Sequence, residues 1–406
     1  MNRSPLKRRL LAAFCLALAS LVAAPAPAAA CSWDYLIWMP HERDADPLYR
    51  FIRGGKAGYI DRSGKVVIEP KFSFYGNGGG VFRGGLMHTG VASGEYVDTS
   101  GKPAVTVADG LESSWDFSEG LAAALDEKTK KWGYIDRTGE FAIRPRFEGH
   151  SGGYVSSFSD GMARIKVADR YGFIDRTGEF VVPPTFLYAE DFHDGMARVV
   201  VEGPCSFSGD GPCPGFRILG GGDADVRQSD DFPACKYTFV DRRGTVLEAR
   251  FEWAKDFSEG LAAVTRGEKW GYIDKSGRFR IEPRFDIAQP FSEGLAQVTQ
   301  GNRRGFIDRR GQFVVPPRFD YADDFSEGLA AVGSVFFEEP GGLFYIDRQG
   351  RTVIPGPFRV GSHFFKGLAH VEFEPVMKGD DIRTRRFAYI DAKGKTVFAY
   401  EVGQED

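Results

Sequence analysis

One short pattern recurs nine times along the 406-residue chain: an aromatic residue, Ile or Val, Asp, two further residues and Gly. The aspartates of the nine copies are Asp61, Asp98, Asp136, Asp175, Asp241, Asp274, Asp308, Asp347 and Asp391, at successive spacings of 37, 38, 39, 66, 33, 34, 39 and 44 residues. A period of about 20–50 residues is typical of proteins built from repeated supersecondary units. The chain is therefore expected to fold as a tandem array.

Each copy has the composition of a tight β-hairpin, and residues 269–285 (KWGYIDKSGRFRIEPRF) are the best example. Asp274 is suited to the first position of the turn, because its carboxylate can accept from backbone N–H groups two residues on. Gly277 is suited to the last position, because glycine adopts a positive φ without steric cost. A three-residue loop of this kind pairs Ile273 with Phe279.

Strict alternation along these strands predicts which residues share a face. Ile273, Phe279 and Ile281 are expected on one face and Tyr272 on the other. Gly271 falls on the Ile273 face, where a missing side chain leaves room for something large.

Two further elements recur around the hairpin. FSEGLA or a close variant precedes it at 117–122, 158–163, 192–197, 257–262, 291–296, 325–330 and 364–369, and Pro-x-Phe follows it in most copies. Proline lacks an N–H and is expected to end the ladder pairing or to mark an edge strand. One unit is then three short strands: LAxV, WGYID and the run before Pro-x-Phe.

The predicted fold is all-β, with about nine three-stranded units over residues 51–398 and a short tail at 399–406. An open, twisted stack with capped ends is favoured, because an open array tolerates any number of units. A closed, β-propeller-like ring is the alternative.

The sequences Lys131-Trp132-Gly133-Tyr134-Ile135-Asp136 and KWGYID at 269–274 resemble the signature of the WG-repeat (KWG) family of bacterial proteins. Together with FSEGLA and Pro-x-Phe, the resemblance covers most of residues 51–398. It implies β-rich repeats in proteins that are often exported. It implies no shared catalytic residues and no reaction.

Residues 1–30 have the organisation of a secretory signal peptide. A basic segment precedes the 13-residue apolar run 10–22, and Ala28-Ala29-Ala30 fits an A-x-A cleavage site. The mature protein is expected in the periplasm or at the cell surface, with Cys31 as its first residue. In the alternative reading Cys31 is lipidated and anchors a lipoprotein, and membrane contact is expected only in that case.

Two segments fall outside the repeat. Residues 31–50 contain Trp33 and Trp38 and are expected to cap the array. Residues 203–236 form an insertion that accounts for the spacing of 66. After loss of Cys15 with the signal, the remaining cysteines are Cys31, Cys205, Cys213 and Cys235. An even number in an exported chain favours disulfides. The pairing stays open, with one bridge inside the insertion preferred.

The repeated polar residues are expected to serve the framework. The turn aspartates and the acid of FSEG are interpreted as turn residues. Fixed aromatic residues are interpreted as core between units. The arginines after the turn aspartates are expected to be solvated turn-tip residues, with an anionic partner as the alternative. They are Arg137, Arg176, Arg242, Arg309 and Arg348.

No catalytic, metal or cofactor motif is found. The six histidines are scattered and no Walker sequence is present. The one G-x-S-x-G run, GHSGG at residues 149–153, gives no nucleophile elbow, which needs a strand before it and a helix after it. The net charge is −4, of which residues 1–30 contribute +4, so the mature chain carries about −8. This charge disfavours nucleic acid as a partner. We expect a non-enzymatic binding or scaffold protein for a protein, envelope glycan or peptide. The alternative is an exported envelope-processing enzyme with its site in the insertion or between repeats.

Overall fold

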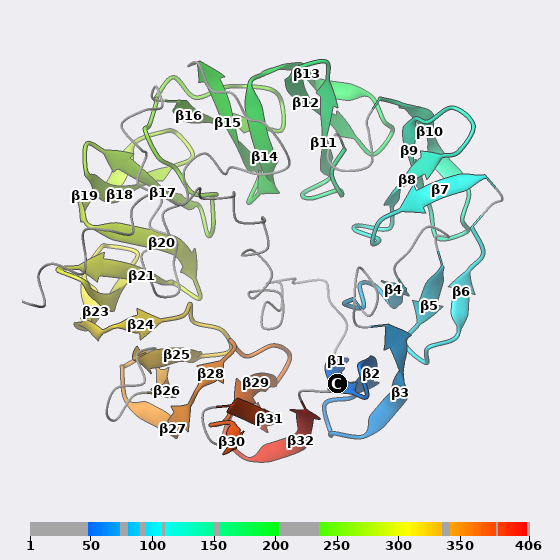
Figure 1. The fold of residues 1–406 in the computed structure, drawn as a ribbon. Coiled ribbons are helices and arrows are strands. Elements are labelled where there is room, and N and C mark those ends of the chain that lie inside the picture. Colours follow the sequence, from blue (N-terminus) through cyan, green and yellow to red (C-terminus); the bar gives the residue numbers. More distant parts are fainter. Residues whose placement is uncertain are drawn as a thin grey trace, which may run out of the picture. The chain divides into compact units, whose positions relative to one another are not determined.

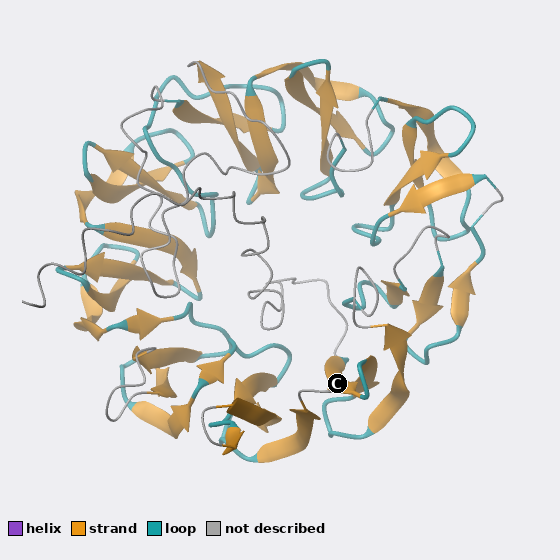
Figure 2. Cartoon of the chain, viewed as in Figure 1, coloured by secondary structure: helices purple, strands orange, loops and turns teal. Residues whose placement is uncertain are grey.

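The computed structural model describes residues 48–73, 80–89, 95–107, 110–148, 155–202, 235–334, 342–378 and 381–403. All of them belong to one compact unit, residues 42–406. The signal peptide, most of the predicted cap and residues 203–234 of the insertion lie outside the described ranges, so predictions on them stay predictions. The described residues form strands, turns and loops (Figure 2), and none of them belongs to a helix able to cross a membrane.

The strands form nine separate antiparallel sheets in chain order (Figure 1). The first holds β1 (Tyr49–Arg53), β2 (Lys56–Ile60) and β3 (Val66–Ser73); the second β4 (Leu86–His88), β5 (Tyr96–Asp98) and β6 (Pro103–Val105); the third β7 (Leu111–Ser114), β8 (Ala122–Asp126), β9 (Trp132–Ile135) and β10 (Phe141–Phe147). The fourth holds β11 (Met162–Val167), β12 (Arg170–Asp175) and β13 (Phe180–Phe186); the fifth β14 (Tyr188–His193), β15 (Met196–Glu202) and β16 (Lys236–Asp241); the sixth β17 (Leu261–Arg266), β18 (Lys269–Asp274) and β19 (Phe279–Phe285). The seventh holds β20 (Ile287–Ser292), β21 (Leu295–Gln300), β22 (Arg303–Asp308) and β23 (Phe313–Phe319); the eighth β24 (Tyr321–Ala322), β25 (Leu329–Ser334), β26 (Gly342–Asp347) and β27 (Thr352–Phe358). The ninth holds β28 (Val360–Gly361), β29 (Leu368–Glu372), β30 (Val376–Lys378), β31 (Asp381–Asp391) and β32 (Thr396–Gly403).

The predicted three-stranded unit is confirmed. In the sixth sheet β17, β18 and β19 are LAAV, WGYID and the Pro-x-Phe run, paired in that order. Several sheets add a strand on the LAxV side, as β20 does in the seventh. The fold is therefore an all-β tandem repeat, and no sheet closes on itself.

The turn chemistry is also confirmed. The Oδ1 atom of Asp274 accepts from the backbone N–H of Ser276 at 2.9 Å and of Arg278 at 3.2 Å. The N–H of Asp274 donates to the carbonyl of Arg278 at 2.9 Å, and Gly277 has a φ of 80°. Equivalent bonds hold the other turns, so the nine aspartates are framework residues.

The predicted face of Ile281 is wrong. Ile273 pairs with Phe279 as expected, but the register then shifts and Tyr272 pairs with Ile281. A β-bulge adds one residue to β19, and one extra residue moves all later side chains to the other face. Ile281 consequently packs with Tyr272, while Ile273 belongs to the core cluster on the opposite side of the sheet.

Gly271 provides the room that the sequence predicts, and backbone fills it. A Cβ at Gly271 would lie 2.5 Å from the carbonyl oxygen of Ile281 and 2.7 Å from the nitrogen of Pro283. β19 is the edge strand of its sheet, as the proline predicts, but the proline does not end the pairing, because the ladder skips Pro283 and resumes with Phe285 opposite Trp270. A larger residue at Gly271 would push the two strands apart.

The core consists of clusters between consecutive sheets. Tyr272 and Phe285 of the sixth sheet pack with Phe291 and Ile307 of the seventh. Trp132 is 1% exposed and lies in an equivalent cluster. The repeated aromatic residues are therefore core, as predicted.

The first and last sheets also contact each other. The rings of Phe51 in β1 and Phe398 in β32 lie 4.9 Å apart, and the Tyr389 hydroxyl donates to the Arg50 carbonyl. The prediction of an open stack with two capped ends is corrected here, because these two sheets bury apolar surface against each other. The contact is face-to-face packing rather than a shared ladder, and it corresponds to the cyclic alternative.

Candidate functional site

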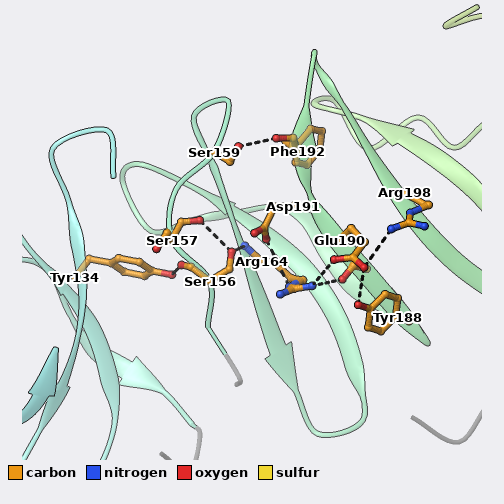
Figure 3. Close-up of polar contacts among 11 residues, drawn as sticks. Tyr134, Ser156, Ser157, Ser159, Arg164, Tyr188, Glu190, Asp191, Phe192 and Arg198 are labelled. Atoms are coloured by element: carbon orange, nitrogen blue, oxygen red, sulfur yellow. Dashed lines mark hydrogen bonds and ion pairs between the residues drawn. The ribbon is translucent and has the colours of Figure 1, made fainter. Parts of the chain in front are cut away.

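The FSEG turns join neighbouring units. Glu259 has a positive φ of 52°, and its carboxylate accepts from the N–H of Gly294 in the next turn at 3.0 Å. Ser258 Oγ donates to the carbonyl of Phe291 at 2.6 Å. Figure 3 shows the same serine bond two units earlier, from Ser159 to Phe192.

The same acid-to-glycine bond recurs along the array, and we call this row the turn belt. Its other acceptor–donor pairs are Glu119–Gly161, Asp160–Gly195, Asp194–Gly260, Glu293–Gly328 and Glu327–Gly367. The FSEG acids are turn residues, as predicted, and they also connect consecutive units. Their carboxylates are therefore occupied by structural hydrogen bonds.

The arginines after the turn aspartates belong to the same belt. Arg176 NH2 donates to the Glu119 carbonyl at 2.7 Å, and Arg309 NH2 to that of Glu259 at 2.6 Å. These arginines are exposed, as predicted, and each also pairs with a group of an earlier turn. The remaining pairs are Arg137–Gly84, Arg348–Glu293 and the ion pair Arg242–Asp160.

A network of half-buried charges joins the fourth and fifth sheets (Figure 3), and Asp256, which precedes β17, extends it towards the sixth. Glu190 accepts from Arg164 at 3.5 Å, from Arg198 at 3.2 Å and from the Tyr188 hydroxyl at 2.7 Å. Arg198 also lies 3.3 Å from Asp256. Burial, together with the Glu190 charge, raises the pKa of Tyr188 well above its usual range. These groups satisfy one another, so the network fixes the position of three sheets.

Among the histidines, His193 is exposed, as expected for a turn residue, and His370 is half-buried against the rings of Phe387 and Tyr389. The His370 Nε2 lies 2.9 Å from the Tyr400 hydroxyl. Burial, and then the nearby Arg50 and Arg385 charges, lower the pKa of His370 to about 3. Within the described ranges no three His, Cys, Asp or Glu side chains are grouped so as to hold a metal ion.

Of the cysteines singled out by the sequence, only Cys235 lies in the described part of the chain. It precedes β16 and packs half-buried against the cluster that contains Tyr237 and Phe251. Cys31, Cys205 and Cys213 lie outside the described ranges. The disulfide and the lipidation of Cys31 stay predictions.

The repeat is interrupted immediately after β16. Other units place a third strand after the turn, but residues 242–260 form isolated bridges instead: Val240–Val246 and Tyr237–Phe251 to β16, and Ala254–Val264 and Ser258–Leu261 to β17. The position of the usual proline is Ala249. Residues 245–251 still lie beside β16, through the Tyr237–Phe251 pair and the bond from the Leu247 N–H to the Phe239 carbonyl, but they form no regular outer strand.

A cleft of about 580 Å³ lies at this interruption, and we call it the basic cleft. Lys236, the segment 249–252, the β17–β18 turn and the start of β19 line it. Its ionisable lining residues are four cations and two carboxylates: Lys236, Arg250, Arg266, Arg278, Glu252 and Glu282. The sequence located the insertion but not this cleft, because its walls come from an irregular outer segment and a neighbouring unit.

The charges of the basic cleft are only partly paired. Lys236 lies 3.4 Å from Glu252, and Arg266 lies 3.3 Å from Glu282. The Arg266 guanidinium also covers the Phe279 ring, 4.0 Å from its centroid. Arg278 is exposed, and its side chain has no hydrogen-bond or ion-pair partner in the described part of the chain. The cleft therefore offers cationic donors that the framework does not use.

A second hollow, of about 810 Å³, lies between the first turn and the last FSEG-type turn. Asp61, Arg62, Ser63, Glu327, Lys366 and Gly367 line it. Glu327 is already bonded to Gly367, and Lys366 replaces the usual belt acid. Its lining is thus largely the turn belt itself, which makes the basic cleft the stronger candidate.

The fold defines the chain as an all-β protein of tandem repeats. The family model described as WG containing repeat matches residues 58–77, 132–171, 171–203, 237–270, 270–303 and 305–333. The repeats of this chain belong to that WG-repeat family.

Solved structures give distant similarities. AztD from Citrobacter koseri has 15% identity over 88% of this chain and 94% of its own, with a TM-score of 0.39. Kluyveromyces lactis Hsv2p has 8% identity over 57% and 71%, with a TM-score of 0.32. BamB from Moraxella catarrhalis has 12% identity over 84% and 77%, with a TM-score of 0.27. These similarities carry no argument about function, and no curated protein matches the chain.

Proposed function

We propose that the protein is an exported, non-enzymatic binding protein that holds a cell-envelope protein or polymer on its repeat surface, with the basic cleft as its specific site. The observation that carries this proposal is the contrast between two sets of arginines. Those of the turn belt pair with groups of an earlier turn, as Arg176 does with the Glu119 carbonyl. Arg278 of the cleft is exposed and has no such partner in the described chain.

Export is part of the proposal, and the predicted signal peptide at residues 1–30 supports it. The mature chain then begins at Cys31 in the periplasm or at the cell surface, or as a lipoprotein if Cys31 is lipidated. An oxidising compartment would allow Cys235 to form the predicted disulfide. Such a bridge would hold the end of the insertion near Lys236, at the rim of the basic cleft.

A panel of defined ligands tests the function. The mature protein is immobilised and exposed to purified envelope glycans and to synthetic peptides, while mass spectrometry follows any chemical change in them. We expect one class to be retained unchanged, and the charge reversal Arg278→Glu to abolish its retention. Lys395→Glu is the matched control, because Lys395 is exposed at the same turn position of the last unit. Turnover of a ligand, or equal loss in both variants, contradicts the proposal.

A further inference from the structure

We infer that the basic cleft binds an acidic peptide segment in which isolated carboxylates alternate with apolar side chains. This inference rests on the proposed function and names the ligand class of the same site. The charges of the cleft, the ring of Phe279 and the shape of the cleft support it.

The cleft first selects for an anion. Four cations and two carboxylates line it, and one of the cations, Arg250, is already held by Glu202 and by the carbonyls of residues 247–249. Arginine presents planar, paired N–H donors that match the two oxygens of a carboxylate. The Arg266 guanidinium lies over the Phe279 ring, and stacking of this kind leaves its N–H edge available in the plane. Arg278 supplies a second guanidinium, which has no side-chain partner among the described residues.

The two carboxylates of the cleft decide which kind of anion fits. Glu252 and Glu282 lie among the cations, each in an exposed ion pair. A polymer with dense, uniform negative charge would be held against both of them, and like charges at close range repel. A peptide can place single carboxylates on Arg278 and Arg266 and neutral residues beside the two glutamates.

The cleft also offers an apolar surface. Phe279 is half-buried, and its ring meets that of the buried Phe251 edge to face at 6.4 Å. An apolar side chain between two carboxylates can pack against Phe279 and remove its surface from water. The volume of about 580 Å³ lies within the range of about 300–1,000 Å³ for small-ligand pockets. The cleft therefore suits a short segment of a protein chain.

The test uses a seven-residue peptide in which aspartate alternates with leucine, labelled with a neutral fluorophore. Its binding to the mature protein is measured by fluorescence anisotropy. A uronic-acid oligosaccharide and a short polyphosphate, each of the same net charge, serve as competitors. The variants are Arg278→Ala, Arg266→Ala and Arg266→Lys, and Lys395→Ala is the control.

We expect saturable binding that Arg278→Ala and Arg266→Ala each weaken about tenfold, since hydrogen bonds between charged groups contribute about that factor. Arg266→Lys is expected to lose most of the affinity, because an ammonium cannot make the paired contact. Lys395→Ala is expected to change affinity less than twofold. Unchanged thermal midpoints in all variants show that each protein is folded.

Three outcomes overturn the inference: no binding of the peptide, equal effects of Arg278→Ala and Lys395→Ala, or tighter binding of the oligosaccharide or polyphosphate. The last outcome contradicts the peptide as ligand but leaves the proposed binding function intact. Failure of every glycan and peptide to bind in an Arg278-dependent way contradicts the function itself.

Discussion

The Tyr389 hydroxyl donates a 2.5 Å hydrogen bond to the carbonyl of Arg50, 339 residues earlier in the chain. Tyr272, at the same repeat position, donates at 2.7 Å to Gln289 of the following sheet. The last sheet is thus joined to the first by the kind of bond that joins neighbours within the array. The repeat chemistry therefore extends across the junction between the two terminal sheets.

Removing this hydroxyl tests the junction. Tyr389→Phe leaves a carbonyl without its donor and is expected to lower the free energy of unfolding by about 1–3 kcal/mol. Tyr272→Phe should cost a similar amount and is the matched control. Urea denaturation measures both. A cost for Tyr272→Phe with none for Tyr389→Phe would show that the first and last sheets are not joined in solution.

The turn belt combines a strained backbone with an inter-unit bond. Glu259 has a φ of 52°, which costs a residue with a side chain about 1 kcal/mol, and its carboxylate accepts from Gly294. Glu259→Ala keeps the strain and loses the acceptor, so we expect a loss of about 1–2 kcal/mol. Glu259→Gly loses the same acceptor but relieves the strain, so it should be the milder change. Equal thermal shifts for the two variants would contradict this account.

His370 predicts a pH dependence of stability. Its pKa is about 3 in the folded protein and about 6.5 in an unfolded chain. Between these values the unfolded chain binds the proton and the folded protein does not, so stability falls as pH decreases from about 6.5 towards 3. The slope from one such group approaches about 1.4 kcal/mol per pH unit. His370→Phe should flatten the curve of unfolding free energy between pH 4 and 6. If His370→Phe left the pH dependence of the unfolding free energy unchanged, the pKa of His370 would not be lowered in the folded protein.

The cysteine prediction concerns the insertion. Peptide mapping of the mature protein without reductant is expected to link Cys235 to Cys205 or Cys213. A free thiol at Cys235 would contradict it. A diacylglycerol adduct on Cys31 would establish the lipoprotein alternative and leave one of the other three cysteines unpaired.

The sequence predicted the parts of this fold that local chemistry determines. Asp274 and Gly277 specify a turn within five residues, and the repeat of that turn specifies the array. The face of Ile281 could not be predicted, because a one-residue bulge leaves no trace in a period-2 pattern. The bond from Glu259 to Gly294 was missed for another reason, since its two ends belong to different units.

The candidate site likewise combines features that neighbouring residues in the sequence determine with features that depend on contacts between units. The spacing of 66 residues located the insertion, but the basic cleft depends on the absence of a regular outer strand after β16. Ala249 in place of the usual proline was the available signal. Arg278 occupies an ordinary turn position in the sequence, and only the structure places it beside Arg266 and Phe279.

Ligand retention by two charge-reversal variants tests whether the basic cleft is the specific binding site. The mature protein, Arg278→Glu and Lys395→Glu are compared on the same panel of envelope glycans and peptides. We predict that the wild-type protein and Lys395→Glu retain the same ligand unchanged. Arg278→Glu is expected to retain none of it. Equal retention by all three proteins, or turnover of the ligand, would contradict it.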